Sequence, residues 1–103
     1  MAFNISLIDE NEENIYYELK GDLDISSASY LEKKILDDFD EKSKNIVLDF
    51  SHLDFIDSMG IGALVSLYRK SIDKNKYVKI NKANSNIRKV FSICDLSDIF
   101  GIN

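Results

Sequence analysis

The sequence has 103 residues, of which 45% are hydrophobic and 30% are charged, and its formal net charge is −5. This length and composition suit one hydrophobic core, so we expect a single domain over residues 1–103. The acidic total argues against nucleic-acid binding, and no apolar run approaches the ~20 residues that a membrane span needs. The acidic N-terminus does not resemble a secretory signal, and a lone cysteine, Cys94, cannot form an internal disulfide. Together these features favour a cytoplasmic protein with no membrane partner.

Four strands are predicted from hydrophobic patterning. Alternating apolar residues predict strands over 3–9 and 15–21, and the short polar stretch between them predicts a hairpin. A compact β-branched run predicts a buried strand over 45–50, and YVKIN predicts a further strand over 77–81.

Three helices are predicted between and after these strands. The first begins near Ser26 or Ser27, or at a capping box of Ser29 with Glu32, and its spacing places four residues in the core: Ala28, Leu31, Ile35 and Phe39. The second spans about 58–74, with an apolar face of Ile61, Leu64, Val65, Tyr68 and Ile72. Ser85 is expected to cap the third, and its spacing predicts that Phe91 and Cys94 face the core.

This order predicts an α/β fold. Strand–helix–strand units require parallel pairing, so the sheet is expected to be mixed, with about four strands, an initial hairpin and parallel pairing elsewhere. Right-handed crossovers in one direction place the helices on one face. Two loops, 21–27 and 50–58, then meet at the carboxyl edge of the sheet, where α/β folds tend to carry their functional groups.

Catalytic and metal-binding motifs are poorly supported. His52 and Cys94 each stand alone, so neither predicts a metal site, and no cofactor motif is evident. The segment DSMG is not the G-x-S-x-G elbow of a hydrolase, and GIG lacks the lysine of a phosphate-binding loop. The loop acids of 22–24 and 54–57 are of a kind that is usually solvated. We therefore predict a non-enzymatic protein.

Ser58 stands where a loop meets the second predicted helix. Either Asp57 or Ser58 could cap the free backbone N–H groups of that helix, which would make the serine purely structural. A phosphate on Ser58 would also suit this position, because it would meet those donors and the positive end of the helix dipole. Gly60 and Gly62 have two interpretations as well: close packing of the helix on the sheet, or an open surface for a partner.

Two segments together resemble a known family. GDLDISSASYLEKKI (21–35) and NIVLDFSHLDFIDSMGIGAL (45–64) are similar to the conserved motifs of STAS domains of the bacterial anti-sigma-factor antagonist type, including its D-S-[ST]-G-[LI]-G signature. The resemblance implies a protein that binds an anti-sigma factor, itself a serine kinase, and so releases a sigma factor. It also implies that the kinase phosphorylates Ser58 to abolish binding, and that a PP2C-type phosphatase restores it.

The predicted partner-binding residues lie on the two loops that share one sheet edge. They are Asp24, Ile25, Ser26, Asp57, Ser58, Met59, Gly60 and Gly62. Met59 departs from the family signature, which has Ser or Thr at that position. This departure leaves an alternative function open: a STAS interaction module without a phosphorylation switch, such as a transport accessory or a signalling scaffold.

Overall fold

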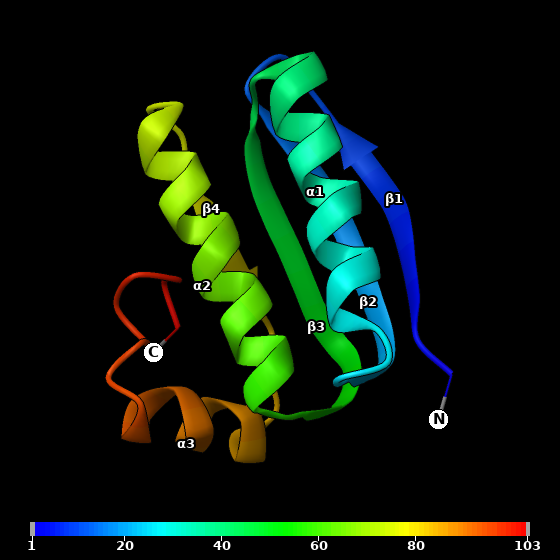
Figure 1. The fold of residues 1–103 in the computed structure, drawn as a ribbon, viewed down its shortest axis with the longest axis vertical. Helices are drawn as coiled ribbons and strands as arrows, with labels where there is room; N and C mark the ends of the chain where they lie inside the picture. Colours follow the sequence, from blue (N-terminus) through cyan, green and yellow to red (C-terminus); the bar gives the residue numbers. More distant parts are fainter. Residues whose placement is uncertain (1, 103) are drawn as a thin grey trace.

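The computed structural model describes residues 2–102. Within this range the elements follow the predicted order of strands and helices. Their bounds are β1 Asn4–Glu10, β2 Asn14–Leu23, α1 Ala28–Lys42, β3 Asn45–Ile56, α2 Ser58–Asp73, β4 Val78–Asn81 and α3 Ser85–Ile93. Strands and helices form one α/β assembly, as predicted (Figure 1).

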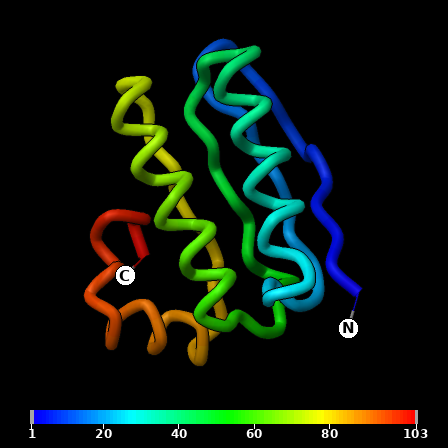
Figure 2. The backbone as a smooth tube through the Cα atoms, in the orientation of Figure 1, coloured from blue at the N-terminus to red at the C-terminus, as the bar shows by residue number. Residues whose placement is uncertain are grey.

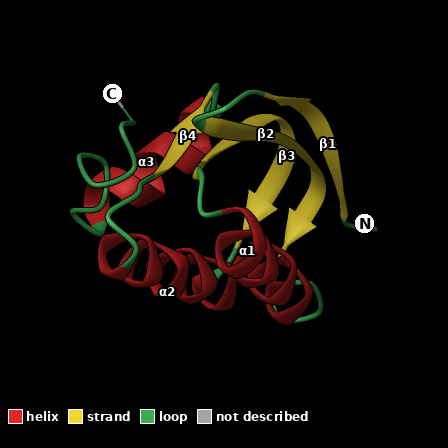
Figure 3. Cartoon of the chain, turned by 90° about the horizontal axis from the view of Figure 1, so that it is seen from above, coloured by secondary structure: helices red, strands yellow, loops and turns green. Residues whose placement is uncertain are grey.

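The sheet has the predicted mixed topology. Among the described residues its strand order is β1-β2-β3-β4; β1 pairs with β2 antiparallel, and the other two pairs are parallel. Because the two crossovers step in the same direction, α1 and α2 cover the same face of the sheet (Figure 3). α3 lies crosswise to α2 at the end where β4 stops, and it contributes buried residues to the same core (Figure 1).

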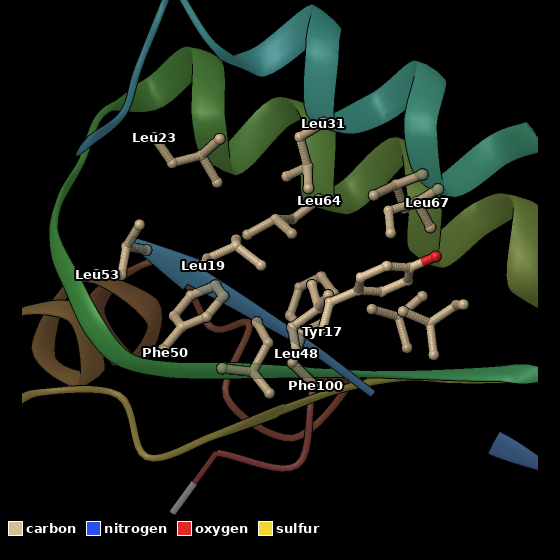
Figure 4. Packing of buried hydrophobic residues seen from close by; sticks show 14 of the residues in the cluster. Tyr17, Leu19, Leu23, Leu31, Leu48, Phe50, Leu53, Leu64, Leu67 and Phe100 are labelled. Carbon is tan, nitrogen blue, oxygen red and sulfur yellow. The ribbon is translucent and has the colours of Figure 1, made fainter. Parts of the chain in front are cut away.

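The core lies between the sheet and these two helices. Alternate residues of β2 and β3 face the helices and are fully or almost fully buried: Ile15, Tyr17, Leu19, Ile46, Leu48 and Phe50. Leu31 of α1 and Leu64 and Leu67 of α2 close the core from the other side (Figure 4). Full burial of each such side chain contributes about 1.5–3 kcal/mol, so this layer fixes the positions of both helices on the sheet.

The helix face agrees with prediction for α1 and in part for α2, where Leu64 is buried and Ile61 and Tyr68 pack against the core. All four expected core residues of α1 are buried. In α2 the buried residues are Gly60, Ala63, Leu64, Leu67 and Ser71, whereas Ile72 is 55% exposed. Small residues let α2 approach the sheet closely, and this packing rotates the larger Ile72 towards solvent. Periodicity of large apolar residues cannot detect a contact that small residues make.

The strands extend further than predicted. β2 runs to Leu23 and β3 to Ile56, so most of the predicted loop 50–58 is strand. The pairing of the two strands continues to the contact of Leu23 with Ile56, across two irregularities in register. These irregularities break the strict alternation of apolar and polar residues that identifies a strand in the sequence. The prediction of a loop over 50–58 is therefore wrong.

The ends of α3 also differ from prediction. Asn84, not Ser85, caps the helix: its side-chain oxygen accepts from the backbone N–H of Ile87 at 2.9 Å. Phe91 is buried as expected, but Cys94 is exposed, so the prediction that it faces the core is wrong. The helix ends at Ile93, so Cys94 is only its C-cap, and Asp95 after it adopts a left-handed backbone (φ 58°).

Candidate functional site

The two predicted segments do meet at one end of the sheet. The turn between β2 and α1 lies beside the junction of β3 and α2 in the chain trace (Figure 2). The backbone N–H of Asp57 donates to the carbonyl of Leu23 at 3.2 Å, which continues the pairing of β2 with β3 up to the residue that precedes α2. The parallel register of these strands therefore brings together residues that are more than thirty positions apart in sequence.

Asp57 is the cap of α2. Its Oδ1 accepts from the backbone N–H groups of Met59 and Gly60, at 2.9 and 3.0 Å. Its Oδ2 accepts from the backbone N–H of Ile25 at 3.2 Å, across the gap between the two segments. Of the two capping candidates, the structure thus selects Asp57, and the same carboxylate also ties the turn before α1 to the start of α2.

Ser58 is the first residue of α2 and is exposed. Its hydroxyl has no hydrogen-bond partner among the described residues. A phosphate on Ser58 would find the N–H groups of Met59 and Gly60 already occupied, because both donate to Asp57. It would instead stand towards solvent, next to a carboxylate.

The two glycines of α2 have different surroundings. A Cβ on Gly60 would lie 2.5 Å from the carbonyl oxygen of Leu23 and 2.9 Å from side-chain carbons of Leu23 and Ile56. Gly60 therefore packs α2 against the ends of β2 and β3. A Cβ on Gly62 would meet nothing within 4 Å, and Gly62 is exposed. The close-packing interpretation thus suits Gly60, and the open-surface interpretation suits Gly62.

The turn from Asp24 to Ser27 is held by its own side chains. Asp24 Oδ1 accepts from the N–H and the hydroxyl of Ser26 at 2.9 and 2.6 Å, and these bonds lower the pKa of Asp24 below its ordinary value of 3.8. The Ser27 hydroxyl donates to the carbonyl of Asp22 at 2.8 Å and accepts from the N–H of Asp24 at 3.0 Å. Ser27 therefore begins α1 without capping it, and Ile25 projects from a fixed turn.

The two segments that meet at this edge carry exposed apolar side chains. Ile25 is 73% exposed, and Met59 and Phe55 are each 52% exposed. Phe55 was not among the predicted site residues, because the segment 50–58 was expected to be a loop. Recognising Leu53 and Ile56 as buried strand residues would have identified Phe55 as an exposed aromatic side chain at the end of β3.

Within residues 2–102, no cluster of three or more His, Cys, Asp or Glu side chains is placed to hold a metal ion. His52 Nδ1 lies 3.0 Å from a carboxylate oxygen of Glu18 on the exposed side of the sheet. None of the helices in this range has the length and apolar character needed to cross a bilayer.

Comparison with known proteins places the chain in a family. The model of the STAS domain matches residues 6–103. The chain belongs to the STAS domain family.

Individual relatives are distant but cover nearly the full length. The anti-sigma-B factor antagonist of Bacillus subtilis is 23% identical over 103 residues, which span 100% of this chain and 93% of that protein. The phosphorylated form of the Bacillus cell fate determinant SpoIIAA superposes with a TM-score of 0.73 at 23% identity, over 95% of this chain and 87% of that one. A sulfate transporter family protein from Wolinella succinogenes reaches 0.73 at 18% identity, over 85% and 71% of the two chains. The two structural matches establish a shared fold.

Proposed function

We propose that this STAS domain is an anti-sigma-factor antagonist. It binds an anti-sigma factor that is also a serine kinase, and this binding releases a sigma factor. The kinase then phosphorylates Ser58, the modified protein no longer binds, and a PP2C-type phosphatase restores it. In this proposal residues 1–103 act as one cytoplasmic domain that catalyses no reaction and needs no cofactor.

The free hydroxyl of Ser58 is the observation that carries the proposal. Asp57 caps α2 through its own carboxylate, so the helix does not need the serine side chain. Ser58 is nevertheless exposed at the junction of the two segments, and the nearby residues Ile25 and Met59 are exposed as well. A hydroxyl with no structural task in an exposed position is available to a kinase.

A phosphate at Ser58 is sufficient to switch binding off. It adds about −1.5 to −2 charges at neutral pH. No lysine or arginine among the described residues forms an ion pair with Asp57, so the new charge would lie next to an uncompensated carboxylate. A partner that covers Ser58 would have to desolvate this charge, at a cost of several kcal/mol. Since about 1.4 kcal/mol corresponds to a factor of ten in affinity, a loss of about 100-fold or more is expected.

The proposal is tested with the kinase and two substitutions. Incubation with the anti-sigma factor kinase and ATP, followed by mass spectrometry, should place one phosphate on Ser58. Ser58→Ala should bind the kinase like the unmodified parent and remain unmodified; Ser58→Asp should fold and bind at least 100-fold more weakly. Tight binding by a folded Ser58→Asp protein, or phosphorylation of Ser58→Ala, would overturn the switch.

Met59 supports a second candidate function. Antagonists of this family usually carry Ser or Thr at this position, and here an exposed thioether lies beside the serine. A STAS module that docks permanently, as a scaffold or transport accessory, would tolerate this residue. In that case Ser58→Asp and Ser58→Ala would bind the partner equally well, and no kinase would modify the parent.

A further inference from the structure

The two outer strands of the sheet are treated differently by the rest of the chain. Beyond β4, the backbone N–H of Ile80 donates to the carbonyl of Phe100 at 2.9 Å, so the C-terminal segment covers that edge. β1 pairs only with β2 among the described strands, and it stands at the margin of the sheet (Figure 3). An edge strand presents a row of N–H and C=O groups that can pair with another strand. Of the two edges, the β1 edge is the one that the described chain leaves open.

β1 lacks the features that protect the edge strands of soluble proteins. These features are charged side chains, proline and a bulge that interrupts pairing. The stretch from Asn4 to Ile8 contains no charged residue and no proline, and the irregularity in its register comes only after Leu7. Leu7 and Ile8 are 52% and 53% exposed. An uncharged edge with two exposed apolar side chains is suited to pairing with a further strand.

Leu7 projects from the helix-covered face of the sheet but is not covered itself. Leu7 is paired with Tyr17, and Ile5 is paired with Leu19. Residues paired in this way project from the same face. Tyr17 and Leu19 are buried in the core, and Ile5 packs against that core. Because Leu7 keeps about half of its surface exposed, it forms an apolar projection at the β1 edge.

A hollow lies near the start of β1. It measures about 340 Å³ and is lined by Ala2, Phe3, Ser26, Ser27 and Tyr30. Tyr30, which comes from the first turns of α1, is 60% exposed. A cavity of about 150 Å³ already holds a benzene-sized group, so this hollow has room for a leucine side chain. The β1 edge therefore carries both an apolar projection and a hollow that can receive one.

The projection and the hollow are symmetric about Ile5. In two antiparallel copies of β1 related by a twofold axis at Ile5, Leu7 of each copy lies opposite Phe3 of the other, because both are two residues from the axis. The same register places Asn4 opposite Ser6, so apolar and polar residues stay on their own faces of the joined sheet. No charged residue faces another across these five positions.

We propose that β1 pairs with β1 of a second copy of this chain. The two sheets then form one continuous sheet, and Leu7 of each copy enters the hollow beside Phe3 and Tyr30 of the other. A strand of seven residues is about 24 Å long, so the interface is small and the dimer is of the weak, transient class. This inference is independent of the proposed function, because it involves neither a kinase nor Ser58.

Sedimentation equilibrium of the parent and two charged variants tests the dimer. Over a range from about 5 µM to about 500 µM, which suits a weak interface, the parent should show a reversible monomer–dimer equilibrium. Leu7→Lys should raise the dissociation constant at least tenfold, because each copy would bring an ammonium group into the hollow of the other. Ile72→Lys is the matched control: it adds the same charge at a side chain of similar exposure, 55%, on α2 and away from β1 (Figure 1). It should associate like the parent.

The outcomes of this experiment decide the proposal. A parent that remains monomeric over the whole range would overturn the dimer. Equal association of the parent and a folded Leu7→Lys protein would assign the dimer to another surface and would overturn the β1 edge as the interface. Equal weakening by Leu7→Lys and Ile72→Lys would reduce the effect to net charge and would overturn it as well.

Tyr30→Ser tests the hollow separately from the strand edge. It removes one wall of the hollow and leaves the backbone of β1 unchanged, and the exposed position of Tyr30 means that the fold should be kept. The dissociation constant of the dimer should rise at least fivefold, with a thermal midpoint near that of the parent. Parent-like association of Tyr30→Ser would overturn the hollow as the site that receives Leu7.

Disulfide cross-linking tests the register. In a Cys94→Ser background, which removes the single exposed cysteine, Ile5→Cys places two thiols opposite each other at the twofold axis. Opposed residues of antiparallel strands have Cα atoms about 4.5–5.5 Å apart, which is within disulfide range. Ile8→Cys is the control, because its two copies would be six residues, or about 20 Å, apart along the strands. Mild oxidation should cross-link Ile5→Cys at least tenfold faster, and equal or faster cross-linking of Ile8→Cys would overturn the register.

Discussion

At the end of the sheet where β2 begins, Glu10 accepts from the ammonium groups of Lys42 and Lys44 at 3.1 and 2.8 Å. At the opposite end, Asp24 and Asp57 accept only from backbone amides and nearby serine hydroxyls. At the first end, the carboxylate of Glu10 is paired with two lysines of the same chain. The second uses its carboxylates to fix backbone segments, and it leaves negative charge, apolar side chains and the Ser58 hydroxyl facing solvent. In the proposed function, the second end is the one that meets the partner.

The largest expected change in stability comes from the two glycines of α2, one of which is packed against the sheet while the other is exposed. Gly60→Ala should lower the free energy of unfolding by about 1–3 kcal/mol, because its Cβ would collide with the rigid carbonyl of Leu23. Gly62→Ala should raise it by up to about 1 kcal/mol, since the site is open and alanine favours a helix. Urea unfolding of both variants measures the difference. Equal shifts in the same direction would refute the close contact at Gly60.

A smaller effect is expected at the start of α3, near the same end. Asn84→Ala should lower the free energy of unfolding by about 0.5–2 kcal/mol, because it removes the acceptor for the Ile87 N–H. Its amide also donates to the carbonyl of Leu53 at 3.2 Å. Ser85→Ala, the change at the residue that the sequence favoured as the cap, should be nearly neutral. Thermal melts of the pair decide between the two caps, and a larger loss for Ser85→Ala would reverse the assignment.

At the end of the molecule that carries Glu10, Asp38 should make the stability of the fold depend on pH. This carboxyl belongs to α1, is buried and accepts from the Tyr17 hydroxyl of β2, and burial raises its pKa above the ordinary 3.8. A raised pKa in the folded state means that stability is lost as pH rises from about 3.8 through the higher value. Asp38→Asn keeps an acceptor for Tyr17 and carries no charge, so its urea midpoint should exceed that of the parent at pH 7 and match it near pH 3. Kinase binding should not change.

Glu10 should give the smallest change in stability, and its contribution should depend on pH in the direction opposite to that of Asp38. Hydrogen bonds from Lys44 and Lys42 lower its pKa below the ordinary 4.5, so it stabilises the fold above that pH and the contribution is lost as pH falls. Glu10→Gln should therefore lower the urea midpoint slightly at pH 7 and leave it unchanged near pH 2. High salt should shrink the difference, because the ion pairs are partly exposed. A midpoint difference that grows as the pH falls would contradict this account.

Hydrophobic periodicity and residue type were enough to predict the order of elements, the mixed sheet and the core face of α1. These features depend on neighbours in sequence: the strand alternation of 15–21 and the helical spacing of Leu31, Ile35 and Phe39 are local signals. The motifs around Asp24 and Ser58 also identified the two segments that meet at one edge, because parallel strands place their carboxyl ends together.

The tertiary structure alone decided how these segments meet. No local pattern shows that one oxygen of Asp57 caps α2 while the other binds Ile25, because that bond depends on the register of β2 against β3. The distinction between Gly60 and Gly62 and the exposure of Phe55, Ile72 and Cys94 depend in the same way on which surfaces the packed sheet and helices cover. Sequence determines which residues can be buried together, and only the assembled layers determine which of them remain exposed to a partner.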